Sequence, residues 1–188
     1  TAIRSLAGQV LSNLCKKNVL ARLTDDFLRD DQERQETRNL LLAFGEKAAL
    51  YLLGRVIVSQ NRAERMAVLD LIPVFKNQAV PVLSECLENS PPWYVIRNII
   101  YIIGQIGCDE NYSLVERYLS HRDERVQYEM ICCVLKLGGC SMTARLTAAL
   151  LAVNIRLKVH VIRLLEQHST KNEGFYVALC KLAENDQS

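Results

Sequence analysis

The sequence predicts an all-α fold, and within that class an α-solenoid built from stacked helix pairs. Glycine and proline are scarce, with 8 and 4 in 188 residues, whereas a β-sandwich or barrel needs many turn-forming residues. Apolar residues recur at helical spacing along nearly the whole chain. The apolar pattern also repeats itself about every 30 residues, which is typical of helical repeat proteins.

The sequence predicts a succession of short helices that are joined by brief polar segments. The apolar residues Ile3, Leu6, Val10 and Leu14 open a first helix that is expected to run to about Leu23. Further helices are expected over residues 33–44, 47–58, 61–75, 78–88, 92–106, 111–119, 123–137, 141–151, 154–168 and 173–184. Glycines and prolines gather in the breaks, and a proline at position 92 suits the first turn of a helix, where no N–H is needed.

The repeat appears when the segment 95–107 is compared with later parts of the chain. A shift of 31 residues places apolar residues on apolar residues: Val95 on Val126, Ile99 on Met130, Ile100 on Ile131, Ile103 on Val134, and Gly107 on Gly138. Further shifts bring residues near 161–165, 67–71 and 40–44 into the same register. Units of this kind bury their apolar stripes by stacking on their neighbours.

The segment WYVIRNIIYIIGQIG (93–107) and the turn SHRDERV (120–126) resemble the short HEAT-like repeats of the phycobilisome-lyase type. Those repeats typically read Val-Arg-x-x-Ala-x-x-x-Leu-Gly-x-Ile-Gly after an Asp-containing turn. The chain departs from that pattern at Gln127, where arginine is common, and at Ile99 and Met130, which replace small alanines.

The resemblance implies a right-handed α-solenoid, armadillo-like, of about five helix pairs in one domain over residues 1–188. Residues 1–32 would form a leading helix and an acidic connector, and residues 33–188 the repeats. The family is used mainly as a protein-binding scaffold, so the resemblance implies a bacterial scaffold or interaction domain.

Composition narrows the function classes. The formal net charge is only +2, too small to indicate nucleic-acid binding by itself. No apolar stretch is long enough to predict a membrane span. The seven cysteines include no C-x-x-C pair and no zinc spacing with the three histidines, so we expect no metal, reduced thiols and a cytoplasmic location.

Sequence signatures of catalysis are absent. No His-Glu dipeptides of the di-iron HEAT-like hydroxylases, no phosphate-binding G-x-x-x-x-G-K-[ST] loop and no G-x-S-x-G elbow occur in the chain. We therefore expect a non-enzymatic protein without a cofactor.

A stripe of arginine and tyrosine on the second helix of each pair is the candidate binding site. It is the face left over when the apolar residues point to the core, and in the middle units it also carries Glu129, Cys132 and Lys136. The residues chosen are Arg62, Arg65, Tyr94, Arg97, Tyr101, Arg125, Tyr128, Arg156, His160 and Arg163. Arginine and tyrosine dominate binding hot spots, so the expected partner is a protein or an acidic peptide.

Other interpretations stay open at this stage. The arginines are also expected to tie back to carboxylates of the preceding turn, such as Glu64, Asp123 or Glu124, and Trp93 is interpreted as a packing lid. The same Arg-rich face suits nucleic-acid binding, as in the HEAT-like DNA glycosylases. A third alternative is a regulatory segment of a larger bacterial signalling protein.

Overall fold

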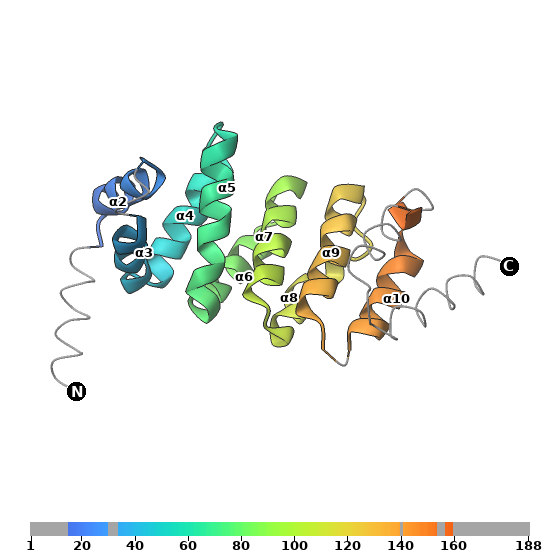
Figure 1. Cartoon of the computed structure of the whole chain (residues 1–188). Helices are drawn as coiled ribbons and strands as arrows, with labels where there is room; N and C mark the ends of the chain where they lie inside the picture. Colours follow the sequence, from blue (N-terminus) through green and yellow to red (C-terminus); the bar gives the residue numbers. More distant parts are fainter. Residues whose placement is uncertain (1–14, 30–33, 140, 154–156, 160–188) are drawn as a thin grey trace, which may run out of the picture. The chain divides into compact units, whose positions relative to one another are not determined.

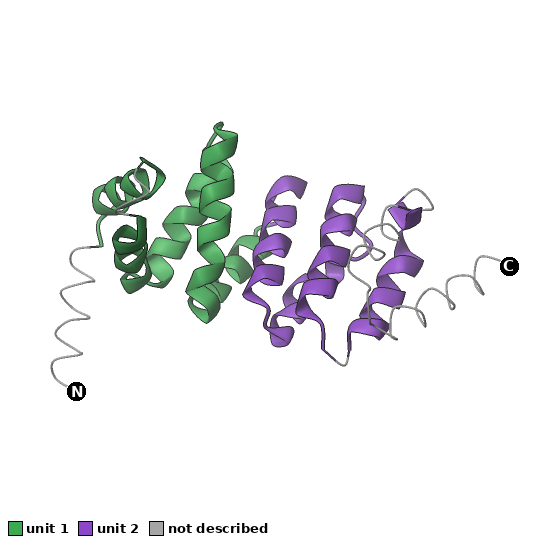
Figure 2. Cartoon of the chain, viewed as in Figure 1, with its two compact units in different colours: residues 1–89 green, residues 90–188 purple. Residues whose placement is uncertain are grey.

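The computed structural model describes residues 15–29, 34–139, 141–153 and 157–159, and these residues form helices with no β-strand among them (Figure 1). The predicted all-α class is confirmed. The chain divides into two compact units, Thr1–Asn89 and Ser90–Ser188 (Figure 2). Each unit has its own apolar core, and each is described by itself below.

Unit 1 contains five α-helices and one 3₁₀ segment within its described part. They are α2 (Lys17–Arg29), α3 (Arg34–Ala43), α4 (Glu46–Val58), α5 (Arg62–Leu71), η1 (Ile72–Gln78) and α6 (Val80–Glu88). The helix α2 packs mainly on α3, and α4 packs on α5 and η1. Leu41, Leu52, Ile72 and Leu83 are fully buried and form the centre of this core.

The first helix differs from its predicted bounds. Residues 1–14, where that helix was expected to begin, lie outside the described residues. Residues 15–16 are not helical, and α2 runs on to Arg29, so Asp25 and Asp26, which were expected in an acidic connector, lie inside a helix. The reason is that Leu20, Thr24 and Phe27 continue one buried face along α2. The buried Thr24 hydroxyl donates to the Leu20 carbonyl at 2.7 Å, which satisfies its polar atom.

The prediction of a single helix over residues 61–75 is wrong. Asn61 caps α5 by accepting hydrogen bonds from the Ala63 and Glu64 amides, but α5 ends at Leu71 and a 3₁₀ segment follows. Pro73 has no N–H to donate and its ring crowds the preceding turn, so the α-helical hydrogen bonding stops there. Lys76, with φ of 50°, then breaks the segment before α6.

Unit 2 is built on two long helices and several short ones. Its elements are α7 (Trp93–Ile106), η2 (Asp109–Asn111), α8 (Tyr112–Val115), η3 (Glu116–Tyr118), α9 (Glu124–Leu137) and α10 (Met142–Ala152). The helix expected over 111–119 is therefore three short pieces, because only Tyr112 and Val115 are buried there and support a helix by packing. Pro92 is extended and precedes α7 as its N-cap rather than lying in its first turn.

The helices α7 and α9 are structurally equivalent in the way the 31-residue shift predicts. The paired residues Val95 and Val126, Ile99 and Met130, Ile100 and Ile131, and Ile103 and Val134 are all buried. Both helices are followed by a glycine with positive φ, 72° at Gly107 and 62° at Gly138, a conformation that glycine adopts without a steric penalty.

Gly104 explains how closely these two helices approach. A Cβ atom placed on Gly104 would lie 3.2 Å from the Cys133 Cα atom. The absence of a side chain on α7 thus lets the backbone of α9 come close, which fixes the register between the two helices. That register determines which polar side chains of α7 and α9 meet on their outer face.

Candidate functional site

Trp93 and Arg125 form the first cross-helix contact between α7 and α9. The Arg125 Cζ atom lies 3.4 Å from the Trp93 ring centroid, a cation–π arrangement. Asp123, the N-cap of α9, accepts from Arg125 Nε at 3.0 Å and from Nη2 at 2.7 Å. These hydrogen bonds from the Arg125 side chain hold the pKa of the Asp123 carboxyl below its usual range. The expected tie of Arg125 to the preceding turn is confirmed, whereas the packing role interpreted for Trp93 stays a prediction.

Arg97 and Glu129 form the second contact. Arg97 Nε donates to Glu129 Oε2 at 3.3 Å, and the Glu129 side chain is only 11% exposed while that of Arg97 is 45% exposed. Glu129 was expected on an outward stripe, so its burial is a correction to the sequence prediction. Burying a carboxylate is costly unless it is paired, and Arg97 supplies the pair while its two Nη groups stay available for other acceptors.

Tyr101 and Lys136 form the third contact, with Lys136 Nζ 4.6 Å from the Tyr101 ring centroid. Residues 93, 97 and 101 follow one another at intervals of four on α7, so they share one face of that helix. We call the three pairs Trp93–Arg125, Arg97–Glu129 and Tyr101–Lys136 the α7–α9 ladder.

The remaining tyrosines of the predicted stripe flank the ladder. Tyr94 is 42% exposed and meets Trp93 edge-to-face with ring centroids 5.9 Å apart. Tyr128 is half-buried, and burial raises the pKa of its hydroxyl above the usual tyrosine range. Unit 2 therefore brings together five of the predicted site residues, namely Tyr94, Arg97, Tyr101, Arg125 and Tyr128.

The other predicted residues are not part of this cluster. Arg62 is exposed in the first turn of α5, and Arg65 Nη1 donates to the Ser59 carbonyl at 2.9 Å, so both belong to unit 1. Arg156, His160 and Arg163 lie outside the described residues.

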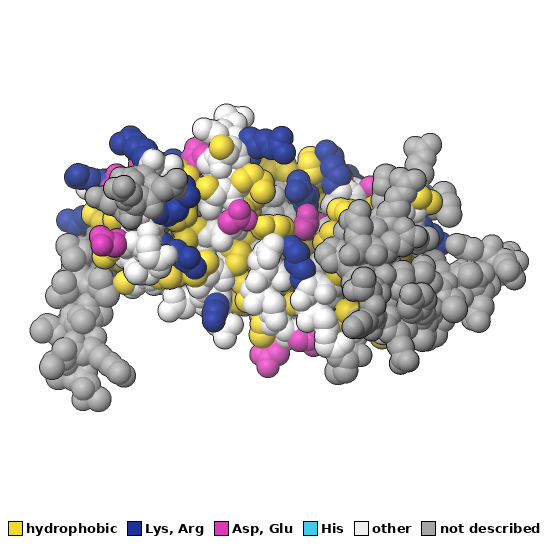
Figure 3. All heavy atoms as spheres, in the orientation of Figure 1, with side chains coloured by type: hydrophobic (Ala, Val, Ile, Leu, Met, Phe, Trp, Pro, Cys, Tyr) yellow, Lys and Arg dark blue, Asp and Glu magenta, His cyan; other side chains and the backbone are white. Residues whose placement is uncertain are grey.

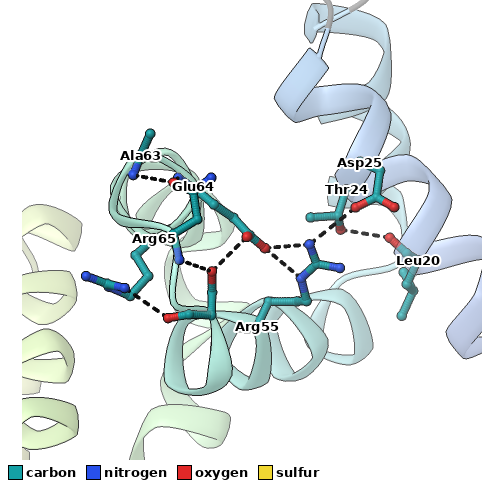
Figure 4. Close-up of polar contacts among 9 residues, drawn as sticks. Leu20, Thr24, Asp25, Arg55, Ala63, Glu64 and Arg65 are labelled. Carbon is teal, nitrogen blue, oxygen red and sulfur yellow. Dashed lines mark hydrogen bonds and ion pairs between the residues drawn. The ribbon is translucent and has the colours of Figure 1, made fainter.

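A second polar cluster, in unit 1, was not predicted (Figure 4). Arg55 of α4 donates to Glu64 of α5 through Nε at 2.8 Å and also through Nη2, and Nη2 contacts Asp25 of α2 at 3.2 Å. Glu64 also accepts from the Ser59 hydroxyl at 2.7 Å. That hydrogen bond is the main reason why the pKa of Glu64 is lowered, with Arg55 adding to it. Glu64 was expected to bind an arginine of the second helix, and it binds Arg55 instead.

The surface next to Arg55 is hollowed. A pocket of about 430 Å³ is bordered by Arg29, Arg34 and Arg55, with Asp25 and Glu64 in its wall. Both carboxylates already bind Arg55. Arg34 is also engaged, because its Nε donates to the Phe27 carbonyl at 3.1 Å.

Several classes of site are not found in the described part of the chain. No three His, Cys, Asp or Glu side chains are grouped to hold a metal there, and the five cysteines that it contains are free. Burial raises the pKa of Cys132 to about 11 and that of Cys133 to about 12, so these thiols are poor nucleophiles. Basic and acidic side chains are interspersed on the face shown in Figure 3.

No single helix in the described ranges is both long and apolar enough to cross a membrane. The segments Arg62–Gln78 and Val80–Glu88 are together long and apolar enough, but the chain bends by 105° between them. Comparison of the chain with protein-family models, with curated proteins and with solved structures gave no match in any of the three.

Proposed function

We propose that the protein is a non-enzymatic interaction module that binds an acidic segment of a partner protein along the α7–α9 ladder. The observation that carries this proposal is that the Arg97 side chain is both exposed and held in place. Its guanidinium is half-exposed and is held through Nε by the buried Glu129. The two Nη groups are left to bind a carboxylate, which a guanidinium does well in bidentate geometry.

The other members of the ladder add cations that are also held in place. Arg125 rests on Trp93 and on Asp123, yet its side chain is 61% exposed, and Lys136 is exposed beside the Tyr101 ring. Side chains that are ordered before binding lose less conformational entropy when a partner arrives. The exposed ring of Tyr94 supplies an apolar contact next to these cations.

For the fold as a whole, we propose that the chain is a HEAT-like right-handed α-solenoid with about five helix pairs, in the cytoplasm. The equivalence of α7 and α9, in buried positions and in terminal glycines, supports this proposal. Repeat proteins of this architecture commonly bind partners on a face formed by equivalent helices, which agrees with a ladder on α7 and α9.

Fluorescence anisotropy with a labelled deca-glutamate peptide at about 50 mM salt tests the binding proposal, with a deca-lysine peptide and a short DNA duplex as comparisons. We expect the acidic peptide to bind, and the double variant R97Q/R125Q to weaken binding by about tenfold or more. Glutamine at 97 keeps a hydrogen-bond donor near Glu129, so circular dichroism should still show a folded protein.

Arg122 gives the matched control, because it is exposed in the turn before α9 but is not a member of the ladder. The variant R122Q should bind the acidic peptide as the parent does. Equal binding by R97Q/R125Q and R122Q, or no binding by the parent, would overturn the proposal. Salt-dependent binding of the duplex in place of the peptide would favour the nucleic-acid alternative.

A further inference from the structure

The cations of the α7–α9 ladder lie on its outer side, and the carboxylates that hold two of them lie beneath. The side chain of Arg97 is 45% exposed, and that of its partner Glu129 is 11% exposed. The side chain of Arg125 is 61% exposed, and that of its partner Asp123 is 16% exposed. Lys136 is exposed as well. A partner that approaches this face therefore meets positive charge first.

The three cations are anchored at equal intervals along α7. Arg97 belongs to that helix. Arg125 of α9 lies over the Trp93 ring, and Lys136 of α9 lies over the Tyr101 ring. Positions 93, 97 and 101 are four residues apart, and an α-helix rises about 1.5 Å per residue. Neighbouring cations of the ladder are therefore about 6 Å apart along the helix axis.

An extended peptide segment repeats at nearly the same distance. Its side chains point alternately to opposite sides, and every second residue lies about 6.6 Å further along the segment. A segment with acidic residues at every second position can thus place one carboxylate at each cation while its backbone runs along α7. Three consecutive acidic residues cannot do so, because the middle side chain points away from the ladder.

A helical partner with acidic residues at every fourth position has a similar spacing, about 6 Å, but the ladder does not suit a helix. Amphipathic helices bind by laying an apolar face into an apolar groove. Tyr94 is the one exposed large hydrophobic side chain on α7 and α9, so these helices offer little to such a face. An extended segment instead needs polar partners for its backbone. Gln105, which is exposed four residues after Tyr101, supplies both a donor and an acceptor in the same row.

We propose that the partner segment binds in an extended conformation and carries acidic residues at every second position, one for each cation of the ladder. This inference rests on the proposed function and adds to it the pattern that the partner must have. Acidic residues in another pattern carry the same net charge but reach fewer of the cations, so selectivity comes from spacing as well as from charge. The central acidic residue binds Arg97 whichever way the segment runs.

Two labelled peptides of the same composition, SESESES and SSEEESS, test the spacing by fluorescence anisotropy at about 50 mM salt. Both have blocked ends, so they differ only in the order of their residues. We expect SESESES to bind about fivefold more tightly, the effect of one additional ion pair. If the two peptides bind equally, or not at all, while deca-glutamate binds, the inference is overturned and the proposed function stands. If deca-glutamate does not bind either, both are overturned. Tighter binding by an alanine-based helical peptide with glutamate at every fourth position would overturn the extended conformation.

A double-mutant cycle tests whether the central acidic residue binds Arg97. The variant R97Q should weaken binding of SESESES about fivefold and leave binding of SESSSES, which lacks the central glutamate, nearly unchanged. The matched variant R125Q should weaken both peptides, because both keep the outer glutamates. The measurements are made where circular dichroism shows both variants to be folded. Equal weakening of the two peptides by R97Q would contradict the assignment.

Discussion

The two units stabilise their helices with polar contacts that are organised differently. In unit 1, one guanidinium, that of Arg55, joins three helices through Asp25 and Glu64. In unit 2, each cation is paired with a carboxylate or with an aromatic ring, one step after another along two helices, as in Arg97–Glu129 and Tyr101–Lys136. A single substitution should therefore affect unit 1 more than unit 2, because the ladder retains its other steps when one is lost.

The largest expected effect comes from removing the centre of the unit 1 cluster. The variant R55M keeps most of the apolar stem of the side chain but leaves Glu64, whose side chain is 17% exposed, without its cation. We expect a loss of about 3 kcal/mol of unfolding free energy, the lower end for a broken buried pair because the site is partly open. Urea unfolding measures it, with R62M as the control at an exposed arginine. A loss below about 1 kcal/mol would show that the cluster adds little.

A smaller effect is expected from the helix contact in unit 2. The variant G104A places a Cβ atom 3.2 Å from the Cys133 Cα atom. Because Cys133 Cα is a backbone atom, this close contact is relieved only if α7 and α9 move apart. We expect a loss of about 2 kcal/mol, as for other overpacked sites. Thermal unfolding followed by circular dichroism measures it. Stability equal to that of the parent would mean that the two helices separate at little cost.

The smallest expected effect is a dependence on pH in unit 1. The pKa of Glu64 is lower in the folded state than in the unfolded state, chiefly because Ser59 donates to it. The unfolded chain then binds the proton first as the pH falls, so this part of the stability is present above the usual glutamate pKa of about 4.3 and is lost below it. Urea unfolding at pH 6 and pH 3.5 should show a smaller loss in E64Q than in the parent. The same loss in both proteins would assign the acid sensitivity to other groups.

Periodicity along the chain predicted most of the helices and the equivalence of α7 and α9, because both depend on apolar residues that repeat at fixed intervals. The resemblance to HEAT-like repeats, and not periodicity, implied that an arginine such as Arg125 binds the turn before its helix. Pro73 was a visible signal that the helix expected over 61–75 would end early, since proline lacks the N–H that an α-helix requires.

The contacts that periodicity missed depend on residues far apart in the chain. Glu129 looks like a surface residue because it is charged, and its burial depends on Arg97, 32 residues earlier on another helix. The Arg55 cluster likewise needs Asp25, 30 residues away. A pattern within one helix carries no information on which side chain of another helix will face it.

The close packing of α7 against α9 has a consequence for how the protein folds. Strong contacts join helices that are neighbours or near neighbours in the chain, such as α2 with α3, α4 with α5, and α7 with α9. Only short loops must close before these contacts form, so the entropic barrier is low and contact order is small. We expect folding on the microsecond-to-millisecond timescale, with nucleation available in either unit.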